Sequence, residues 1–199
     1  DAIPASIRER LEGKLVVAYI GALNASYAVD ASLALFAKIR ARRPDAHLLG
    51  LTRQEGAMTR AADAAGIGPD DRTLTAVGHD ELPAWLRAID WGLLLLRSPF
   101  AKRGSMPTKL GEWFAAGVRP LQHGCNVEVS GWVAQCGSGV VLPSLSEADL
   151  DAAADEVAKH PLDRESLARA REIARGHFSL DAGVAAYEAM LRPFLAEPS

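Results

Sequence analysis

The residues from Ser105 to Pro120 read SMPTKLGEWFAAGVRP, and they place a polar turn and a helix start directly after an apolar run. That run, Trp91 to Leu96, has the nearly continuous apolar character of a parallel strand buried on both faces. Proline is tolerated in the first turn of a helix, so we expect a helix to open near Pro107. Gly117 is expected to end it, because glycine adopts the left-handed backbone that often terminates helices.

The start of this expected helix has the chemistry of an anion site. The first backbone N–H groups of a helix lack partners within it and carry partial positive charge, which favours a phosphate. Lys109 and Glu112 are three residues apart and share a face. A cation for phosphate and a carboxylate that accepts hydrogen bonds from sugar hydroxyls would therefore lie together. The alternative is that these two residues form only a solvated ion pair on an exposed helix.

The composition indicates a globular protein without a broad basic surface. The chain has 199 residues, of which 49% are hydrophobic and 24% charged, enough for one core in a single domain. A net charge of -3 argues against nucleic acid or an anionic membrane as the main partner. No apolar run approaches the ~20 residues of a membrane helix, so we expect no transmembrane segment.

The cysteines indicate the cellular compartment of the protein, and the first residue indicates whether the chain is complete. Cys125 and Cys136 lack metal-ligand spacing with the five histidines and form no disulfide framework. We therefore expect no metal site and a reducing, cytoplasmic location. Since the chain begins at Asp1, without an initiator methionine, we also expect it to be a fragment of a longer protein.

Apolar runs alternate with helical patterns along the chain, which predicts an α/β fold. Six expected strands cover Lys14 to Ile20, Ala46 to Leu51, Thr73 to Ala76, Trp91 to Leu96, Arg119 to Gln122 and Gly139 to Leu142. Helices are expected to start near Tyr27, Gly56, Asp80, Thr108, Asn126 and Ser146, and two more to run from Leu162 to His177 and from Ser179 to Leu195.

We therefore predict a Rossmann-like, doubly wound, mostly parallel six-stranded sheet with helices on both faces and two C-terminal helices. One domain spans residues 1–199, and its C-terminal helices occupy residues 162–199. In such a sheet, ligands bind beyond the carboxyl ends of the strands where the winding direction changes. This places the loop after Ile20 beside the loop after Leu96 and makes Gly21 and Ser105 neighbours.

Four segments of the chain form a recognisable combination. They are LVVAYIGAL (Leu15 to Leu23), VGHDELPAWLRAIDWGLLLL (Val77 to Leu96), SMPTKLGEWFAAGVRPL (Ser105 to Leu121) and HFSLDAGVAAYEAML (His177 to Leu191). The third is the most specific, because a Ser-x-Pro-Thr-Lys-x-x-Glu turn before a small-residue helix is rarer than alternating strands and helices. Together the segments resemble the nucleotide-binding, C-terminal half of GT-B glycosyltransferases, within the family 4-like proteins called glycosyl transferases group 1.

The resemblance implies a donor domain whose substrate is a nucleotide-diphospho-sugar, a UDP- or GDP-sugar. It implies that the loop after the first strand and the turn before the helix hold the diphosphate. The residues of these two segments are Gly21, Ala22, Ser105, Met106, Pro107, Thr108 and Lys109. By the same resemblance, Glu112 binds the ribose hydroxyls and the base lies near Val77, Gly78 and His79. Lys109 and Glu112 are thus the residues expected to support catalysis.

Group 1 relatives usually retain the anomeric configuration and need no dedicated metal, so the resemblance implies retaining transfer without a metal or another cofactor. It also implies an N-terminal domain, absent from this chain, that holds an acceptor sugar, lipid or protein. Through that domain the protein would attach peripherally to the inner membrane.

The chain departs from the pattern of the family at two places. Many relatives have a Gly-Arg pair after the first strand and a lysine a few residues on, whereas residues Gly21 to Leu23 read GAL and no such cations follow. Many also have a glutamate eight positions before the second one, and the matching residue is Gly104. The cations that would replace the lost charge are Arg53, Lys102 and Arg103.

Two alternatives remain open on the sequence. One is a GT-B-fold sugar epimerase, such as the UDP-N-acetylglucosamine 2-epimerases, which share the architecture but lack the Pro-Thr-Lys-Leu-Gly-Glu turn. The other is a Rossmann-type module that senses a nucleotide or binds another protein without catalysis. The missing Gly-Arg pair and Gly104 motivate the second alternative.

Overall fold

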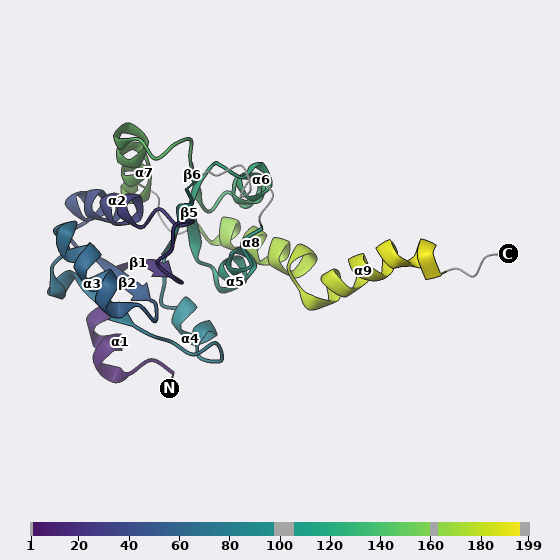
Figure 1. The fold of residues 1–199 in the computed structure, drawn as a ribbon, viewed down its shortest axis with the longest axis horizontal. Helices are drawn as coiled ribbons and strands as arrows, with labels where there is room; N and C mark the ends of the chain where they lie inside the picture. Colours follow the sequence, from purple (N-terminus) through teal and green to yellow (C-terminus); the bar gives the residue numbers. More distant parts are fainter. Residues whose placement is uncertain (1, 98–105, 160–162, 196–199) are drawn as a thin grey trace.

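The computed structural model describes residues 2–97, 106–159 and 163–195, and these form a six-stranded sheet packed between helices (Figure 1). The strands are β1 (Leu15–Ile20), β2 (Ala46–Leu51), β3 (Arg72–Thr75), β4 (Trp91–Leu94), β5 (Arg119–His123) and β6 (Val140–Leu142). Their order in the sheet is β3-β2-β1-β4-β5-β6, and every neighbouring pair is parallel. The predicted doubly wound parallel sheet is therefore confirmed.

The described helices are the expected ones with two short additions. They are α1 (Ala5–Leu11), α2 (Val29–Arg42), α3 (Glu55–Ala64), the 3-10 turn η1 (Pro69–Asp71), α4 (Leu82–Leu86), α5 (Lys109–Ala116), α6 (Val127–Cys136), α7 (Glu147–Lys159), α8 (Arg164–His177) and α9 (Leu180–Leu195). The additions are η1, which has three residues, and helix α1. Helix α1 has seven residues and buries only Leu11, so its sequence carries too weak an apolar pattern to predict it.

Two hydrophobic cores lie on the two faces of the sheet. Helices α2, α3 and α7 cover one face, and helices α1, α4, α5, α6 and α8 cover the other. Along β1, Val17 and Tyr19 point to the first core, whereas Val16 and Ala18 point to the second. Successive side chains of a strand point to opposite faces, so burial on both sides explains the continuous apolar runs.

Helix α5 sits close to the sheet and to α8 because glycines face large rings at both contacts. Gly92 of β4 leaves room for the indole of Trp113, and a side chain there would collide with that ring. On the side of α5 that faces α8, Gly111 leaves room for Phe178, and a Cβ on Gly111 would lie 2.6 Å from the Cβ of Phe178. Gly117 ends α5 in the left-handed conformation with φ of +89°, as predicted.

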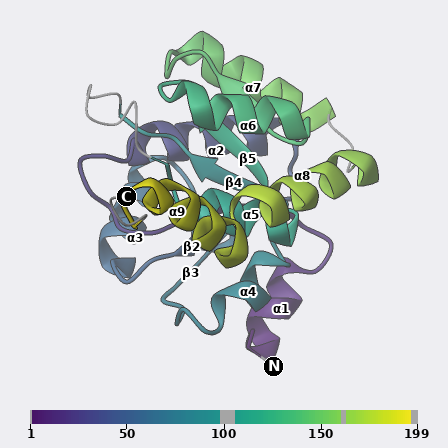
Figure 2. The same ribbon diagram turned by 90° about the vertical axis from the view of Figure 1, so that its right-hand side faces the viewer.

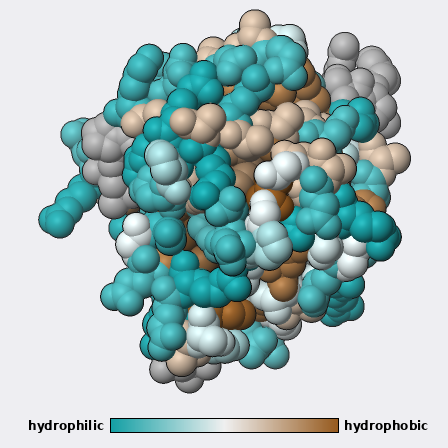
Figure 3. Space-filling view, turned by 90° about the vertical axis from the view of Figure 1, so that its left-hand side faces the viewer, coloured by the Kyte–Doolittle hydropathy of each residue, from teal (hydrophilic) through white to brown (hydrophobic). Residues whose placement is uncertain are grey.

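Helix α9 projects away from the sheet (Figure 1), and in the view turned by 90° it lies in front of the sheet, pointing towards the viewer (Figure 2). Six large apolar side chains on it are exposed: Leu180, Val184, Tyr187, Met190, Leu191 and Phe194. By contrast, the opposite end of the molecule shows many hydrophilic residues, with strongly apolar residues in hollows between them and a band of weakly apolar residues across the upper part of the view (Figure 3). In the part of the chain that the structure describes, no helix has the length and apolar character needed to cross a membrane.

Burial of His47 makes stability dependent on pH. This β2 residue is 2% exposed, and its Nε2 lies 2.9 Å from the Thr73 hydroxyl. Burial, together with the nearby positive charge of Arg10, lowers the pKa of His47 from 6.5 to about 4. Between about pH 6.5 and pH 4, His47 is therefore protonated in the unfolded chain and neutral in the folded chain. The free energy of unfolding falls as the pH drops through this range.

We predict that His47→Gln reduces the loss of unfolding free energy between pH 6.5 and pH 4 by about 2–3 kcal/mol, because a neutral amide binds no proton in either state. Urea unfolding at several pH values between 4 and 7 measures this change in unfolding free energy. The exposed His177→Gln on α8 serves as the control and should keep the acid-dependent loss. If the unfolding free energy of His47→Gln depended on pH as that of the unmodified protein does, His47 would not be the group responsible for the loss of stability in acid.

Candidate functional site

The carboxyl ends of β1 and β4 lie side by side at the centre of the sheet, where the strand order changes direction. Backbone hydrogen bonds join the segments that follow them. The Ala28 N–H donates to the Leu95 carbonyl and the Arg97 N–H to the Ser26 carbonyl. The expected approach of the loop after β1 to the chain after β4 is thus present in the described residues. Ser105, the expected neighbour of Gly21, lies outside them.

Lys109 joins the start of α5 to the end of β1. Its ammonium donates to the Ile20 carbonyl oxygen at 2.7 Å and lies 4.5 Å from the centre of the Tyr27 ring. A Cβ on Gly21 would lie 3.3 Å from the same nitrogen. The site thus places a lysine charge, the first residue of a helix and a glycine turn together, although Ile20 and Lys109 are 89 positions apart.

The turn before α5 differs in detail from the prediction. Helix α5 begins at Lys109, so Pro107 precedes the helix instead of occupying its first turn. The Pro107 carbonyl accepts the Leu110 N–H at 3.0 Å. Thr108 is exposed at the N-cap and makes no side-chain capping bond, while Met106 is partly buried against the core beneath α5.

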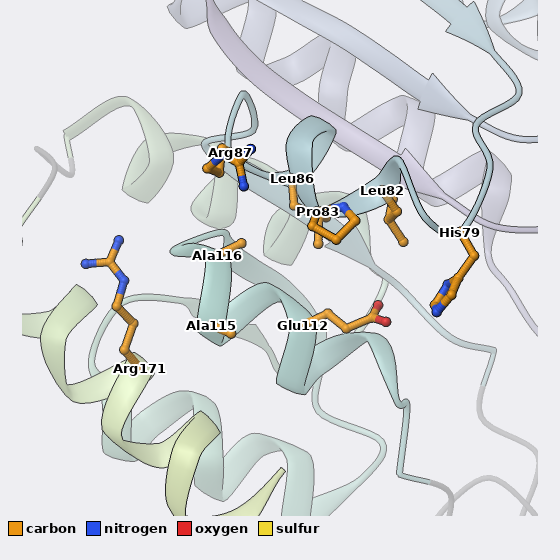
Figure 4. Close-up of a pocket in the computed structure, with 9 residues that line it drawn as sticks. All are labelled: His79, Leu82, Pro83, Leu86, Arg87, Glu112, Ala115, Ala116 and Arg171. Carbon is orange, nitrogen blue, oxygen red and sulfur yellow. The ribbon is translucent and has the colours of Figure 1, made fainter. Parts of the chain in front are cut away.

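Glu112 faces a different space from Lys109. It lines a cavity of about 430 Å³ between α4 and α5, and Figure 4 shows its carboxylate directed towards the His79 side of that cavity. The described structure places no ion pair between Lys109 and Glu112, because Lys109 is turned to the end of β1. The alternative of a simple surface ion pair between them is therefore not what the structure shows.

A second cavity, of about 330 Å³, lies beside the first along the carboxyl edge of the sheet. Six of the residues expected near the ligand line it: Gly21, Ala22, Arg53, Val77, Gly78 and His79. His79 and Leu82 line both cavities and so form their common wall. The two spaces, one beside Gly21 and one beside Glu112, have a combined extent suited to a small ligand of nucleotide size.

Sequence reasoning missed four polar residues that line these cavities. Thr52 and Gln54 line the second, and their position directly after a strand is a signal that could have identified them. The Gln54 side chain also accepts the Leu23 N–H at 2.7 Å. Arg87 and Arg171 line the first cavity. Arg171 comes from α8, more than fifty positions beyond the motif, and no local pattern indicates its role.

Arg97 is near the same edge but is already paired. Its guanidinium binds Asp30 at 2.8 Å. Within the described ranges, no group of three or more His, Cys, Asp or Glu side chains is placed to hold a metal ion.

No protein-family model matches the sequence, and no curated protein matches it. Solved structures do match. WaaG, a glycosyltransferase involved in lipopolysaccharide biosynthesis, has a TM-score of 0.68 at 18% identity, covering 98% of this chain and 52% of its own. Sucrose-phosphate synthase from Thermosynechococcus elongatus has a TM-score of 0.72 at 18% identity, covering 98% of this chain and 50% of its own.

The C-terminal domain of a glycosyl transferase group 1 family protein (LpcC) from Francisella tularensis has a TM-score of 0.66 at 11% identity, covering 87% of this chain and 91% of its own. A UDP-N-acetylglucosamine 2-epimerase from Listeria monocytogenes is also similar, with a TM-score of 0.61 at 14% identity over 96% of this chain and 49% of its own.

These structures place the chain in the GT-B class of folds, to which the glycosyltransferase neighbours belong. More particularly, it has the fold of one Rossmann-like half of such an enzyme, the half that the isolated LpcC domain represents. The chain spans about half the length of WaaG and of sucrose-phosphate synthase.

The turn at Gly21 gives a direct test of the site geometry. The backbone φ of Gly21 is +124°, which residues with a side chain rarely adopt, and an added Cβ would lie tightly against the Lys109 ammonium. We predict that Gly21→Ala lowers the free energy of unfolding by about 1–3 kcal/mol, as measured by urea denaturation.

Gly13→Ala is the matched control, since φ there is +69° and an added Cβ meets nothing within 4 Å. We expect Gly13→Ala to lower the free energy of unfolding by about 1 kcal/mol, because only the left-handed backbone conformation is unfavourable there. A Gly21→Ala loss no larger than the control would contradict a tight fit between Gly21 and Lys109.

Proposed function

We propose that this chain is the donor-binding domain of a glycosyltransferase and binds a nucleotide-diphospho-sugar at the carboxyl edge of its sheet. The observation that supports this most is the placement of Lys109, which brings a cation and a helix start against the turn at Gly21. Next to it, Glu112 and His79 face a cavity large enough for a nucleoside. The fold of the neighbouring structures supports the same proposal.

The diphosphate would lie between Gly21 and the start of α5. An ammonium has three N–H donors, and Lys109 uses one of them on the Ile20 carbonyl, which leaves donors for phosphate oxygens. The first N–H groups of α5 add partial positive charge at the same point. Ala22 and Arg53 line the same cavity. The motif residues Ser105 to Thr108 complete the phosphate site in this proposal.

The ribose would meet Glu112, whose exposed carboxylate can accept hydrogen bonds from two hydroxyls. The base would lie on the side of Val77, Gly78 and His79. His79 lines both cavities, so a ligand with its phosphates at Gly21 and its ribose at Glu112 passes along this residue.

In the reaction, the bond from the anomeric carbon to the diphosphate oxygen breaks while the acceptor hydroxyl oxygen bonds to that carbon and loses its proton. The diphosphate leaves with added negative charge, which Lys109 and the helix start would stabilise without a metal. Transfer with retained configuration, and an acceptor held by a second domain, complete the proposal. Because one half supplies only one side of a cleft, the isolated domain should bind donor and turn over little.

The epimerase neighbour supports one alternative, since its fold is shared. The two activities differ in what they require. An epimerase converts UDP-N-acetylglucosamine without an acceptor, whereas a transferase consumes donor in step with an acceptor. Product analysis with the full-length protein separates them.

The binding proposal predicts two distinct mutant effects, measured by titration calorimetry with UDP, GDP, ADP and pyrophosphate. Lys109→Ala should weaken all of the ligands that bind by about tenfold or more, because charge-assisted bonds to phosphate are lost. Glu112→Ala should weaken the nucleotides by about tenfold and leave pyrophosphate binding within about twofold, because it removes only the ribose contact.

Lys159→Ala and Glu128→Ala, at exposed positions on α7 and α6, are the matched controls and should bind as the unmodified protein does. Circular dichroism melting checks that Lys109→Ala stays folded after losing its bond to Ile20. The proposal is wrong if no nucleotide binds, or if both variants bind every ligand with unchanged affinity.

A further inference from the structure

Tyr27 lies between β1 and α2, and its aromatic ring contacts the Lys109 ammonium. The ammonium nitrogen lies 4.5 Å from the centre of the ring, within the distance of about 6 Å at which an aromatic face attracts a cation. The same nitrogen donates a hydrogen bond to the Ile20 carbonyl. Two groups from the region where β1 ends therefore hold the charge of a side chain that belongs to α5.

The neighbours of Tyr27 fix its ring in place. The backbone of Tyr27 forms a bridge with Leu96, and the next N–H, that of Ala28, donates to the Leu95 carbonyl at 2.9 Å. The ring also packs edge to face against the buried Tyr19, with ring centres 6.3 Å apart and an angle of 74° between the planes. A ring held by both its backbone and its neighbour is a rigid support for the flexible four-carbon stem of a lysine.

Both groups that hold Lys109 are uncharged. Over the ranges that the structure describes, no carboxylate forms an ion pair with its ammonium, whereas Arg97 at the same edge of the sheet is bound to Asp30 at 2.8 Å. A carboxylate partner would compensate the positive charge and compete with an incoming anion. An aromatic face and a backbone carbonyl attract the ammonium and leave its full charge for a phosphate.

We propose that Tyr27 is a positioning residue, which holds Lys109 at the end of β1 with its charge uncompensated. The inference rests on the proposed function, since it concerns how the diphosphate is bound. A lysine that is free to rotate loses conformational entropy when it binds phosphate, and a support that fixes it beforehand reduces this loss. Tyr27 thus acts on the ligand through Lys109 and needs no contact of its own with the phosphates.

Titration calorimetry with pyrophosphate, and with whichever of UDP, GDP and ADP binds most tightly, tests this role. We expect Tyr27→Leu, which replaces the aromatic face with an aliphatic side chain, to weaken both ligands by about three- to tenfold. Tyr27→Phe restores the face and should bind both within about twofold of the unmodified protein, because the ring is what contacts the ammonium. Tyr187→Leu, at an exposed position on α9, is the matched control and should leave binding unchanged.

A double-mutant cycle shows whether Tyr27 acts through Lys109. In Lys109→Ala the ring has no ammonium to hold. Adding Tyr27→Leu to this variant should therefore weaken the nucleotide by less than about twofold more. A nucleotide is the probe for the cycle because its proposed ribose contact does not involve Lys109. A merely structural role of Tyr27 would give the same loss in both backgrounds.

Nuclear magnetic resonance of the unmodified protein tests the contact without any ligand. The ring current of Tyr27 should shift the protons next to the Lys109 nitrogen upfield of the same protons in Lys159, which is exposed on α7. The upfield shift should persist in Tyr27→Phe and disappear in Tyr27→Leu. This measurement on the unmodified protein applies even if Tyr27→Leu does not fold.

The outcomes separate the two proposals. If neither pyrophosphate nor a nucleotide binds the unmodified protein, the proposed function fails and this inference fails with it. If they bind but Tyr27→Leu keeps their affinity, or weakens the nucleotide equally in the Lys109→Ala background, Tyr27 does not position Lys109 and donor binding stands. Lack of an upfield shift at Lys109 in the unmodified protein would also overturn the positioning role.

Discussion

The indole of Trp113 lies against Gly92, and this contact sets the distance of helix α5 from the sheet. Within the described residues the indole N–H of Trp113 has no hydrogen-bond acceptor, so packing alone holds the ring in place. Gly111 brings α8 equally close to the other side of the helix. With α5 fixed on both sides, Lys109 meets the end of β1 and Glu112 faces α4. The positions of Lys109 and Glu112 thus depend on Gly92 and Gly111, which lie at the packing contacts of α5 and outside the site.

Much of the fold follows from the apolar pattern, because a parallel sheet buried on both faces requires continuous apolar strands. The limits of β2 were predicted residue for residue, and the other strands differ by one or two positions at one or both ends. The expected strand from Trp91 extends only to Leu94 because the next residues turn to the loop after β1, where Leu96 forms a bridge with Tyr27. The sequence of this strand alone does not show where its backbone stops pairing with neighbouring strands and begins pairing with the loop after β1.

The site was predictable only where its residues belong to the strand ends or to the motif. Gly21, His79, Lys109 and Glu112 are of this kind, and the structure gathers them along one edge of the sheet. Arg171 could not be found, since its place depends on how α8 packs against α5. Nor could the sequence show that Lys109 and Glu112 face different spaces. Side chains three apart on a helix share a broad face, and the neighbouring elements decide where each one points.

The chain lacks the pair of cations that the family resemblance leads one to expect after the first strand, and the structure shows which charges of the described residues lie at this edge instead. At the end of β4, Arg97 is bound to Asp30 and so is not a simple substitute. Arg53 faces the cavity from the end of β2, across from the turn at Gly21. Lys102 and Arg103, the other two expected replacements, lie outside the described residues. Among the described residues, the attraction for a diphosphate in the proposed complex rests on Lys109, Arg53 and the dipole of α5. Because the net charge of the chain is -3, this attraction is local and acts at the site instead of over the whole surface.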